Sequence, residues 1–560
     1  ERHDHGAVRT LAFLLAICAL GAGCAAEPAG PATHVGDWRD QVIYQIVVDR
    51  FDDADPDNDT IDGIGPDRTD LARFQGGDWR GVERRLDYIA RLGATTIWIS
   101  PPYRNVPRTE REDGYHGYWP ADFLEPNPRL GSLDELRSLV RAAHARGMLV
   151  ILDVVPNHAG RVFTYDLDRD GQVDPGEIEP PWSGEVPYDA PLLFTDRPRM
   201  LLDGAELTLE ARHFHRRGFG DLGVPMQKEL GDFPTGLRDL DTENDEVVRA
   251  LIETHAWWVE QTDVDGFRID AVPHAARDFW ARFCGGLREA LAAIGKHRFL
   301  MVGEVFSSDP VDLASYAGLH ALDSAFAFDL KWDLIDAVIL EGRAPELAIG
   351  ALVSNRSFFP LSGQPLGVDL SPWDARVAFA DNHDVWRLRG ELDDPYAAEL
   401  ALTVVFTVDA IPAIYYGTEQ GLAGQSHHEA REPLWLGAGF DESAPMYRFI
   451  QRLAEIRRRS LALRRGEVIV RYASTVGARD AEAEDASFLA YERAYEGERL
   501  LVAMNAGATD ASRARMQTGF PGGTRLVDAL GRASAPWVVQ DGGVLDITLP
   551  PRSVVVLEPQ

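Results

Sequence analysis

Short apolar runs alternate with amphipathic stretches along most of this chain. The runs VIYQIVV (42–48) and TTIWIS (95–100) are rich in β-branched residues and predict buried strands. The stretch 78–93 between them repeats apolar residues at helical spacing and ends at a glycine. A capping box at Ser132 and Glu135 indicates a further helix. Strands and helices that alternate in this way predict an α/β fold with a parallel sheet.

The alternation is interrupted once and later ends. Between His158 and about Asp241, Pro, Gly and Asp residues punctuate a stretch that is too long for an ordinary loop. Alternation resumes at 244–261 and continues to an expected eighth strand near 413–417. From about Gly466 the chain changes to short strands, which predict an antiparallel β-sandwich.

The composition limits the classes of function. A chain of 560 residues with 45% hydrophobic content can bury a large core, and length alone suggests about three or four domains. The formal net charge of -33 argues against nucleic-acid binding, which needs a basic surface. The same charge disfavours an anionic substrate.

The first 26 residues are typical of a secretory signal peptide, because the apolar run at 11–20 follows basic residues and is too short to span a bilayer. GAGC, ending at Cys24, resembles a bacterial lipobox, in which this cysteine would be lipidated. Ordinary cleavage after Ala26 is the alternative. Residues 27–38 predict a flexible tether. We expect a protein that is secreted or lipid-anchored at the bacterial cell envelope, with no other membrane contact.

Several short motifs place acidic residues just after predicted strands, where parallel barrels keep their chemistry. An isolated acid in such a position is more often a helix cap or a loop residue. The motifs are DVVPNH (153–158), GFRID (266–270), GEVF (303–306), FADNHD (379–384), YHGYWPADF (115–123) and IPAIYYGTEQ (411–420). The first four of these motifs, in this order along the chain, resemble the α-amylase family of glycoside hydrolases (glycoside hydrolase family 13), most closely its secreted bacterial α-amylases, and the other two motifs extend the resemblance. The resemblance extends from about Val42 to the C-terminus.

The resemblance implies an α/β fold of three parts. These are an eight-stranded β/α (TIM) barrel, a domain B inserted after the third strand, and a C-terminal antiparallel β-sandwich domain. The expected limits are 1–26 for the signal peptide, 27–38 for the tether, 39–158 and 242–464 for the two barrel segments, 159–241 for domain B and 465–560 for the C-terminal domain.

The resemblance also assigns chemical roles. Asp270 corresponds to the nucleophile and Glu304 to the general acid and base of a retaining glycosidase, with Asp384 as transition-state stabiliser. Arg268 precedes Asp270 by two residues on the same strand, so both side chains face the same way and the arginine can keep the aspartate ionised. Asp153 is expected to organise the site without reacting. The predicted sugar-contacting residues of the substrate site are His116, Tyr118, His158, Arg268 and His383.

One to three Ca²⁺ ions are expected. The resemblance implies one site at Asn157, Asp239 and the carbonyl of His274. It implies a second, as in cyclodextrin glucanotransferases, at Asp53, Asp55, Asn58, Asp59, Asp78 and the carbonyl of Gly76. The third prediction comes from spacing alone, because DLDRDGQVDPGE (166–177) fits an EF-hand loop. Its ligands would be Asp166, Asp168, Asp170, Gln172, Asp174 and Glu177. The alternative is a solvated acidic turn.

The expected activity is retaining hydrolysis of α-1,4-glucosidic bonds in starch, glycogen or maltooligosaccharides by a monomer. A cyclodextrin or maltogenic hydrolase, or a transglycosylase, is the alternative within the family. A noncatalytic glucan-binding surface protein is disfavoured because all three carboxylates are present. Pro273 stands where many members carry a lysine that contacts leaving-side sugars, so the product pattern stays open. The stretch 421–435 favours starch-degrading members.

Overall fold

The computed structural model describes residues 30–182, 190–233, 235–391, 394–437, 439–478 and 483–560. The predicted signal peptide and the lipobox cysteine Cys24 lie outside these residues. Within the described ranges, no helix has the length and apolar character needed to cross a bilayer.

Eight parallel strands form the centre of the molecule. They are β1 (Ile43–Ile46), β2 (Thr96–Ile99), β5 (Leu149–Val154), β12 (Gly266–Ile269), β13 (Leu300–Gly303), β14 (Ser324–Ala325), β15 (Val377–Phe379) and β16 (Ile411–Tyr415). Each strand pairs with the next, and β16 pairs with both β15 and β1. A parallel bridge between Phe326 and Val377 joins β14 to β15, so the sheet closes into a barrel. The predicted β/α barrel is confirmed.

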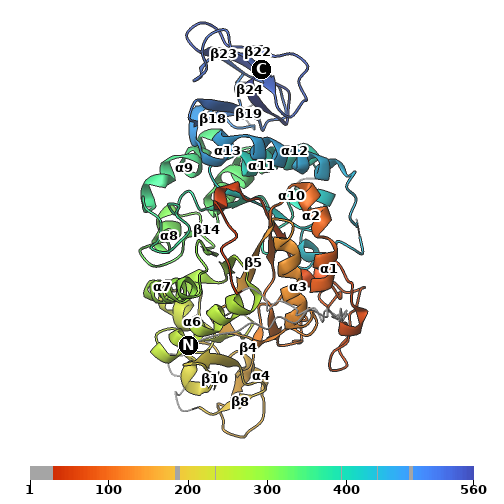
Figure 1. Ribbon diagram of the computed structural model, residues 1–560, viewed down its shortest axis with the longest axis vertical. Coiled ribbons are helices and arrows are strands. Elements are labelled where there is room, and N and C mark those ends of the chain that lie inside the picture. The colour runs from red at the N-terminus through yellow and green to blue at the C-terminus, as the bar shows by residue number, and fades with distance from the viewer. Residues whose placement is uncertain (1–29, 183–189, 234, 392–393, 438, 479–482) are drawn as a thin grey trace, which may run out of the picture.

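Helices surround the barrel (Figure 1). They include α1 (Trp79–Arg84), α2 (Leu86–Leu92), α3 (Leu133–His144), α6 (Asp245–Thr262), α7 (Arg277–Ala293), α8 (Pro310–Ser315), α9 (Ile349–Leu352), α10 (Leu388–Glu391), α11 (Pro395–Thr407), α12 (Pro445–Arg459), α13 (Leu461–Arg465) and a π-helix at Leu330–Leu340. The stretch 78–93, predicted as one helix, forms two, because Arg85 leaves the helical region with φ -101° and ψ 3°. The predicted apolar face is buried all the same.

Domain B leaves the barrel after β5 and lies at the end of the molecule opposite the C-terminal sheets (Figure 1). Its base is an antiparallel pair of β6 (His158–Ala159) with β11 (Arg238–Asp239), which brings the two ends of the insertion together. Between them lie β7 (Phe163–Tyr165), α4 (Pro175–Ile178), β8 (Leu192–Phe194), β9 (Arg199–Leu202), β10 (Ala205–Thr208) and α5 (Pro225–Leu230). A separate hairpin, β3 (Tyr103–Asn105) with β4 (Pro120–Pro126), follows β2.

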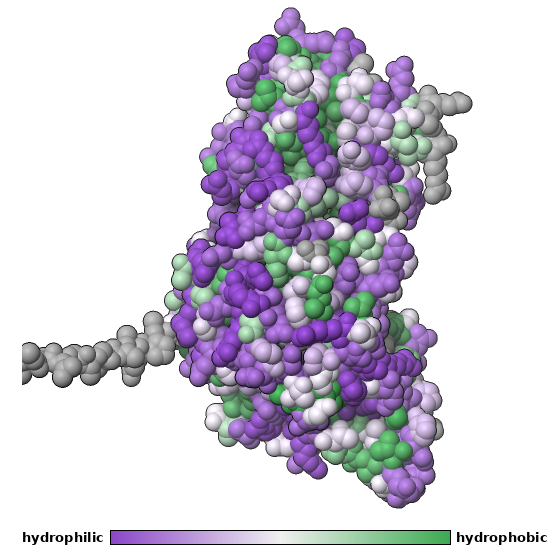
Figure 2. Space-filling model, turned by 90° about the vertical axis from the view of Figure 1, so that its right-hand side faces the viewer, coloured by the Kyte–Doolittle hydropathy of each residue, from purple (hydrophilic) through white to green (hydrophobic). Residues whose placement is uncertain are grey.

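The C-terminal domain is antiparallel, as predicted. Its larger sheet has the order β17-β18-β19-β24-β21-β22, and β20 pairs with β23 in a smaller one. The strands are β17 (Glu467–Ala473), β18 (Phe488–Tyr495), β19 (Glu498–Asn505), β20 (Ala511–Gln517), β21 (Arg525–Asp528), β22 (Trp537–Val538), β23 (Val544–Leu549) and β24 (Ser553–Pro559). Apolar side chains from both sheets, such as Phe488, Leu501 and Ile547, form one buried cluster. Figure 2 shows that the face seen there is largely hydrophilic, in keeping with the acidic composition.

Arg238 is fully buried at the base of domain B. Its Nη1 pairs with Asp232 Oδ2 at 2.6 Å, while Nε and Nη2 donate to the carbonyls of Phe163 and Ile178, each at 2.8 Å. One guanidinium therefore joins three segments of domain B directly beside Asp239.

We expect Arg238→Met to destabilise the protein by about 3–5 kcal/mol, because the buried carboxylate of Asp232 would lose its counter-charge. The measurement is the free energy of unfolding in urea. The control is Arg249→Met, which removes an exposed pair with Asp203 and should leave stability near the parental value. Equal losses in the two variants would contradict the assigned role of Arg238.

Candidate active site

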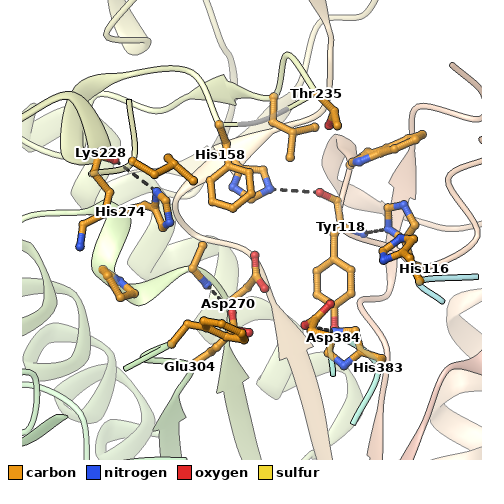
Figure 3. Close-up of a pocket in the computed structure, with 18 of the residues that line it drawn as sticks. His116, Tyr118, His158, Lys228, Thr235, Asp270, His274, Glu304, His383 and Asp384 are labelled. Carbon is orange, nitrogen blue, oxygen red and sulfur yellow. Dashed lines mark hydrogen bonds and ion pairs between the residues drawn. The ribbon is translucent and has the colours of Figure 1, made fainter. Parts of the chain in front are cut away.

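A cleft of about 620 Å³ opens at the carboxyl ends of the barrel strands, and domain B contributes Lys228, Phe233 and Leu237 to its lining. Figure 3 shows Asp270 and Glu304 side by side on its floor, with Asp384 and His383 beyond them. The lining includes every predicted catalytic carboxylate and four of the five predicted sugar-contacting residues. Arg268, the fifth, lies buried directly beneath them.

One buried guanidinium holds the carboxylates of neighbouring strands together. Arg268, in β12, is 2% exposed. Its Nη1 lies 2.7 Å from Asp270 Oδ1 and 3.1 Å from Asp153 Oδ1, and its Nη2 lies 3.1 Å from Glu304 Oε2. Because Ile269 pairs in register with Gly303, the residues that follow them, Asp270 and Glu304, leave adjacent strands at the same height. The predicted orientation of Arg268 toward Asp270 is confirmed.

Burial raises the pKa of Glu304 to about 8, and the charges of Asp270 and Asp384 add to this against the opposing effect of Arg268. Burial also raises the pKa of Asp153, to about 7. Asp153 accepts hydrogen bonds from Trp98 Nε1 and the Tyr118 hydroxyl, however, and both stabilise its anion. Glu304 Oε2 accepts one long backbone hydrogen bond, from the amide of Ala271, at 3.3 Å. We therefore place the proton of this cluster on Glu304 near neutral pH.

Asp384 lies in the loop after β15 and is held as an anion. Burial alone would raise its pKa, but His383 and Arg431 lower it below the ordinary value. His383 Nε2 lies 2.9 Å from Asp384 Oδ2, and Arg431 Nη2 lies 2.9 Å from Oδ1. Gln45 of β1 donates to His383 Nδ1 at 2.7 Å, which leaves the proton of the neutral ring on Nε2, facing Asp384.

Tyr118 forms one wall of the cleft. Its hydroxyl donates to Asp153 Oδ2 at 2.7 Å, and its ring stacks on His383 with centroids 5.1 Å apart. Its amide donates to His116 Nδ1 at 3.0 Å, and its carbonyl accepts from His158 Nε2 at 3.1 Å. Burial lowers the pKa of both histidines, so both are neutral. The structure thus brings the predicted sugar-contacting residues together.

Sequence reasoning missed five residues of the site: Gln45, Arg431, Lys228, Phe306 and Glu112. Gln45 could have been noticed as the polar residue within the apolar strand IYQI. Lys228 reaches the cleft from α5, and its carbonyl accepts a hydrogen bond from His274 Nδ1 at 3.2 Å. Lys228 and Pro273 both line the cleft, and Pro273 stands where many family members carry a lysine. No local sequence pattern predicts that Lys228 lines the cleft, because the fold of domain B places it at the site.

The first predicted calcium site is assembled. Asn157 Nδ2 lies 3.2 Å from Asp239 Oδ1 and 2.9 Å from the His274 carbonyl. Neutral His158 donates through Nε2, so its Nδ1 needs a donor, yet Asn157 Oδ1 faces it at 3.1 Å. Turning the amide by 180° satisfies Nδ1 and directs Oδ1 toward Asp239 and His274. Three oxygens then converge, and these residues fit Ca²⁺.

The second predicted site also fits a cation. Asn58 Oδ1 and Asp59 Oδ1 are buried and have no hydrogen-bond partner in the described part of the chain. Burial and neighbouring carboxylates raise the pKa of Asp59 to about 6. A Cβ at Gly76 would collide with Oδ1 of Asp59. Glycine at this position therefore leaves room for the carboxylate of Asp59 next to residue 76, whose carbonyl is a predicted ligand. Asp78 has a further role, because it caps α1 and accepts the amides of Ala54 and Asp55.

The EF-hand-like loop brings its predicted ligands together in two overlapping groups. Carboxylate oxygens of Asp166, Asp168 and Glu177 lie within 4.8 Å of one another, as do those of Asp168, Asp170 and Asp174. Gly171 has φ +75°, as the sharp turn requires. Glu177 is buried and accepts the amide of Leu167, so its carboxylate is turned into the loop. Gln172 would contribute its carbonyl.

A closed parallel barrel with paired carboxylates at its carboxyl edge defines the class of barrel glycosidases. The model of the α-amylase catalytic domain matches residues 45–175 and 227–434, and that of the maltogenic amylase C-terminal domain matches 481–556. The chain belongs to the α-amylase family, glycoside hydrolase family 13. The predicted family is confirmed.

Relatives within the family carry different names. An α-amylase of Streptomyces lividans is 32% identical, over 88% of this chain and 57% of its own. A cyclomaltodextrin glucanotransferase of Geobacillus stearothermophilus is 29% identical, over 90% and 65% respectively. The solved structure of a cyclomaltodextrin glucanotransferase with a three-domain ABC distribution is 26% identical with a TM-score of 0.74, covering 95% of this chain and 100% of its own. The chain thus spans less than two thirds of the first two relatives.

Proposed function

We propose that this protein hydrolyses α-1,4-glucosidic bonds in starch-like glucans with retention of configuration. The observation that carries the proposal is the sharing of Arg268 by Asp270 and Glu304, and the raised pKa of Glu304 supports it. Retaining glycosidases need one ionised and one protonated carboxyl group across the scissile bond, about 5–5.5 Å apart. Neighbouring strand ends supply both groups here.

In the proposed mechanism, Asp270 attacks the anomeric carbon while Glu304 gives its proton to the leaving oxygen. The glycosyl-enzyme ester is then hydrolysed by water that Glu304, now ionised, deprotonates. Arg268 pairs with the carboxylate of Asp270, and Asp384 stabilises the positive charge that develops on the sugar ring. Tyr118 offers an aromatic face, and His383 and His116 offer polar contacts to sugar hydroxyls.

Cyclodextrin glucanotransferase activity is the second candidate. It is supported by the three-domain structure with that name, which this chain covers over its full length. Both activities use the same carboxylates and differ in whether water or a sugar hydroxyl attacks the intermediate. Chromatography of products from soluble starch separates them, because linear maltooligosaccharides indicate hydrolysis and cyclic products indicate transfer.

We expect Asp270→Asn to abolish turnover of starch and Glu304→Gln to reduce it by about 10²- to 10⁴-fold, because nucleophile and proton donor are lost. The matched control is Glu206→Gln, an exposed residue of β10, which should keep the parental rate. Near-parental hydrolysis by either carboxylate variant would refute the assignment. Proton NMR should first show the α-anomer, and initial release of the β-anomer would exclude the double displacement.

The pH profile tests the proton on Glu304. Because burial raises its pKa to about 8, the acid form is complete below that pH and is lost above it, so activity should fall as pH rises through about 8. Glu304→Gln should remove this alkaline limb. A nitrophenyl maltooligosaccharide, whose leaving group needs little protonation, should be affected far less by the substitution than starch. An unchanged alkaline limb in the variant would assign it to another group.

We also propose that calcium stabilises the fold without taking part in the chemistry. Asn157 directly precedes His158, and Asp239 lies where the chain leaves domain B, so an ion held by both would fix one wall of the cleft. The orphaned oxygens of Asn58 and Asp59 support a second ion, and the EF-hand-like spacing of 166–177 supports a third.

Chelation should lower the melting temperature, and added calcium should restore it, because an ion that binds only the folded state stabilises it. The double variant Asp166→Ala with Glu177→Ala should contain one ion fewer by elemental analysis while keeping the parental rate on starch. Equal calcium content in variant and parent would mean that the loop is a solvated acidic turn.

A further inference from the structure

Glu112, His427 and His428 form a cluster at the rim of the cleft, apart from the catalytic carboxylates. Glu112 comes from the segment between β3 and β4, and the histidines come from the segment that follows β16. Glu112 and His427 line the cleft on the side of His116 and Arg431. Two segments far apart in the sequence therefore meet here through side chains that can ligate a metal.

The spacing within the cluster is that of ligands rather than of hydrogen-bonded groups. His427 Nε2 lies 3.7 Å and His428 Nδ1 lies 3.6 Å from the same atom, Glu112 Oε2. Hydrogen bonds between nitrogen and oxygen span about 2.7–3.2 Å. A tetrahedral ion with bonds of about 2.0–2.2 Å holds its ligand atoms roughly 3.3–3.6 Å apart. All three donor atoms lie within 4.8 Å of one another.

The carboxylate supplies a second, independent observation. Glu112 Oε2 is shielded from solvent and has no hydrogen-bond partner within the described ranges. Arg431, the nearby cation, is engaged elsewhere, because it donates to the His383 carbonyl and to Asp384. A buried carboxylate oxygen without a donor is costly, and a cation between it and the two imidazoles would satisfy it.

A similar trio at the other end of the barrel shows the contrast. His34, His144 and Asp263 also lie within ligand distance of one another. There, however, Lys296 Nζ lies 2.7 Å from Asp263 Oδ1, and His34 Nε2 lies 2.8 Å from Oδ2. Both carboxylate oxygens already have donors, so this trio needs no ion and provides a matched control.

We propose that Glu112, His427 and His428 bind a divalent cation of the zinc class. Two imidazoles and one carboxylate suit Zn²⁺ and leave its fourth position open, whereas Ca²⁺ prefers oxygen ligands. The ion ties the segment before β4 to the segment after β16 and so fixes the wall of the cleft that carries His116 and Arg431.

The test uses the full chain, stripped with EDTA and kept in excess Ca²⁺ so that the oxygen sites are filled. Calorimetric titration with ZnCl₂ should show a site for one ion per chain, and Zn²⁺ should raise the melting temperature. In His427→Ala with His428→Ala this affinity should fall at least about 100-fold and the thermal shift should vanish. Both histidines are partly exposed, at 52% and 36%, so the variant should fold.

Two further variants sharpen the result. Glu112→Gln keeps the shape of the side chain and removes its charge, and should weaken Zn²⁺ binding by about 10-fold or more. His34→Ala should leave binding unchanged. Substitution with Co²⁺ should give the visible absorption of a tetrahedral site in the parent and not in the double histidine variant. Zinc affinity that is absent in the parent, or equal in the parent and the double variant, would overturn the proposal.

Discussion

The site depends on one buried guanidinium. Arg268 binds Asp153, Asp270 and Glu304 at once, so three carboxylates share a single positive charge. Burial favours the neutral form of a carboxyl group and raises the pKa of Glu304 to about 8. Trp98 and Tyr118 donate to Asp153, and Arg268 lies closest to Asp270, which leaves the proton on Glu304. This distribution of donors supports the proposed division of roles, with Asp270 as nucleophile and Glu304 as acid.

The barrel makes that arrangement possible. Parallel pairing of β12 with β13 places their last residues at one level, and closure through Phe326 and Val377 brings β15 and its following loop around to face them. Asp384 can then oppose Asp270 although the chain between them contains several helices. Its own partners, His383 and Arg431, lower its pKa and keep it ionised. Asp384 therefore carries a negative charge at a pH at which Glu304 is still protonated.

The walls of the cleft come from segments that lie outside the strands and helices of the barrel. Domain B contributes Lys228, the segment before β4 contributes Glu112, and the segment after β16 contributes His427. Each needs a tie to the barrel. Arg238 joins segments within domain B. The proposed calcium ligands around Asn157 would tie domain B to the barrel, and the proposed zinc ligands would supply a tie for the other two segments. Binding of ions would thus couple stability to the shape of the cleft.

Local sequence predicted most of the elements and the candidate catalytic residues. Alternating apolar runs and amphipathic stretches predicted a parallel α/β fold followed by antiparallel strands. The resemblance carried by the motifs around Asp270, Glu304 and Asp384 predicted the barrel and the candidate carboxylates, because these motifs consist of neighbouring residues at strand ends. Tertiary structure alone decided the rest. The helical spacing of 78–93 did not predict the break at Arg85, whose side chain pairs with the distant Asp52. Lys228 and Arg431 reach the site through long excursions whose paths no local periodicity specifies. The pairing of Glu112 with His427 and His428 exists only because folding joins two distant segments.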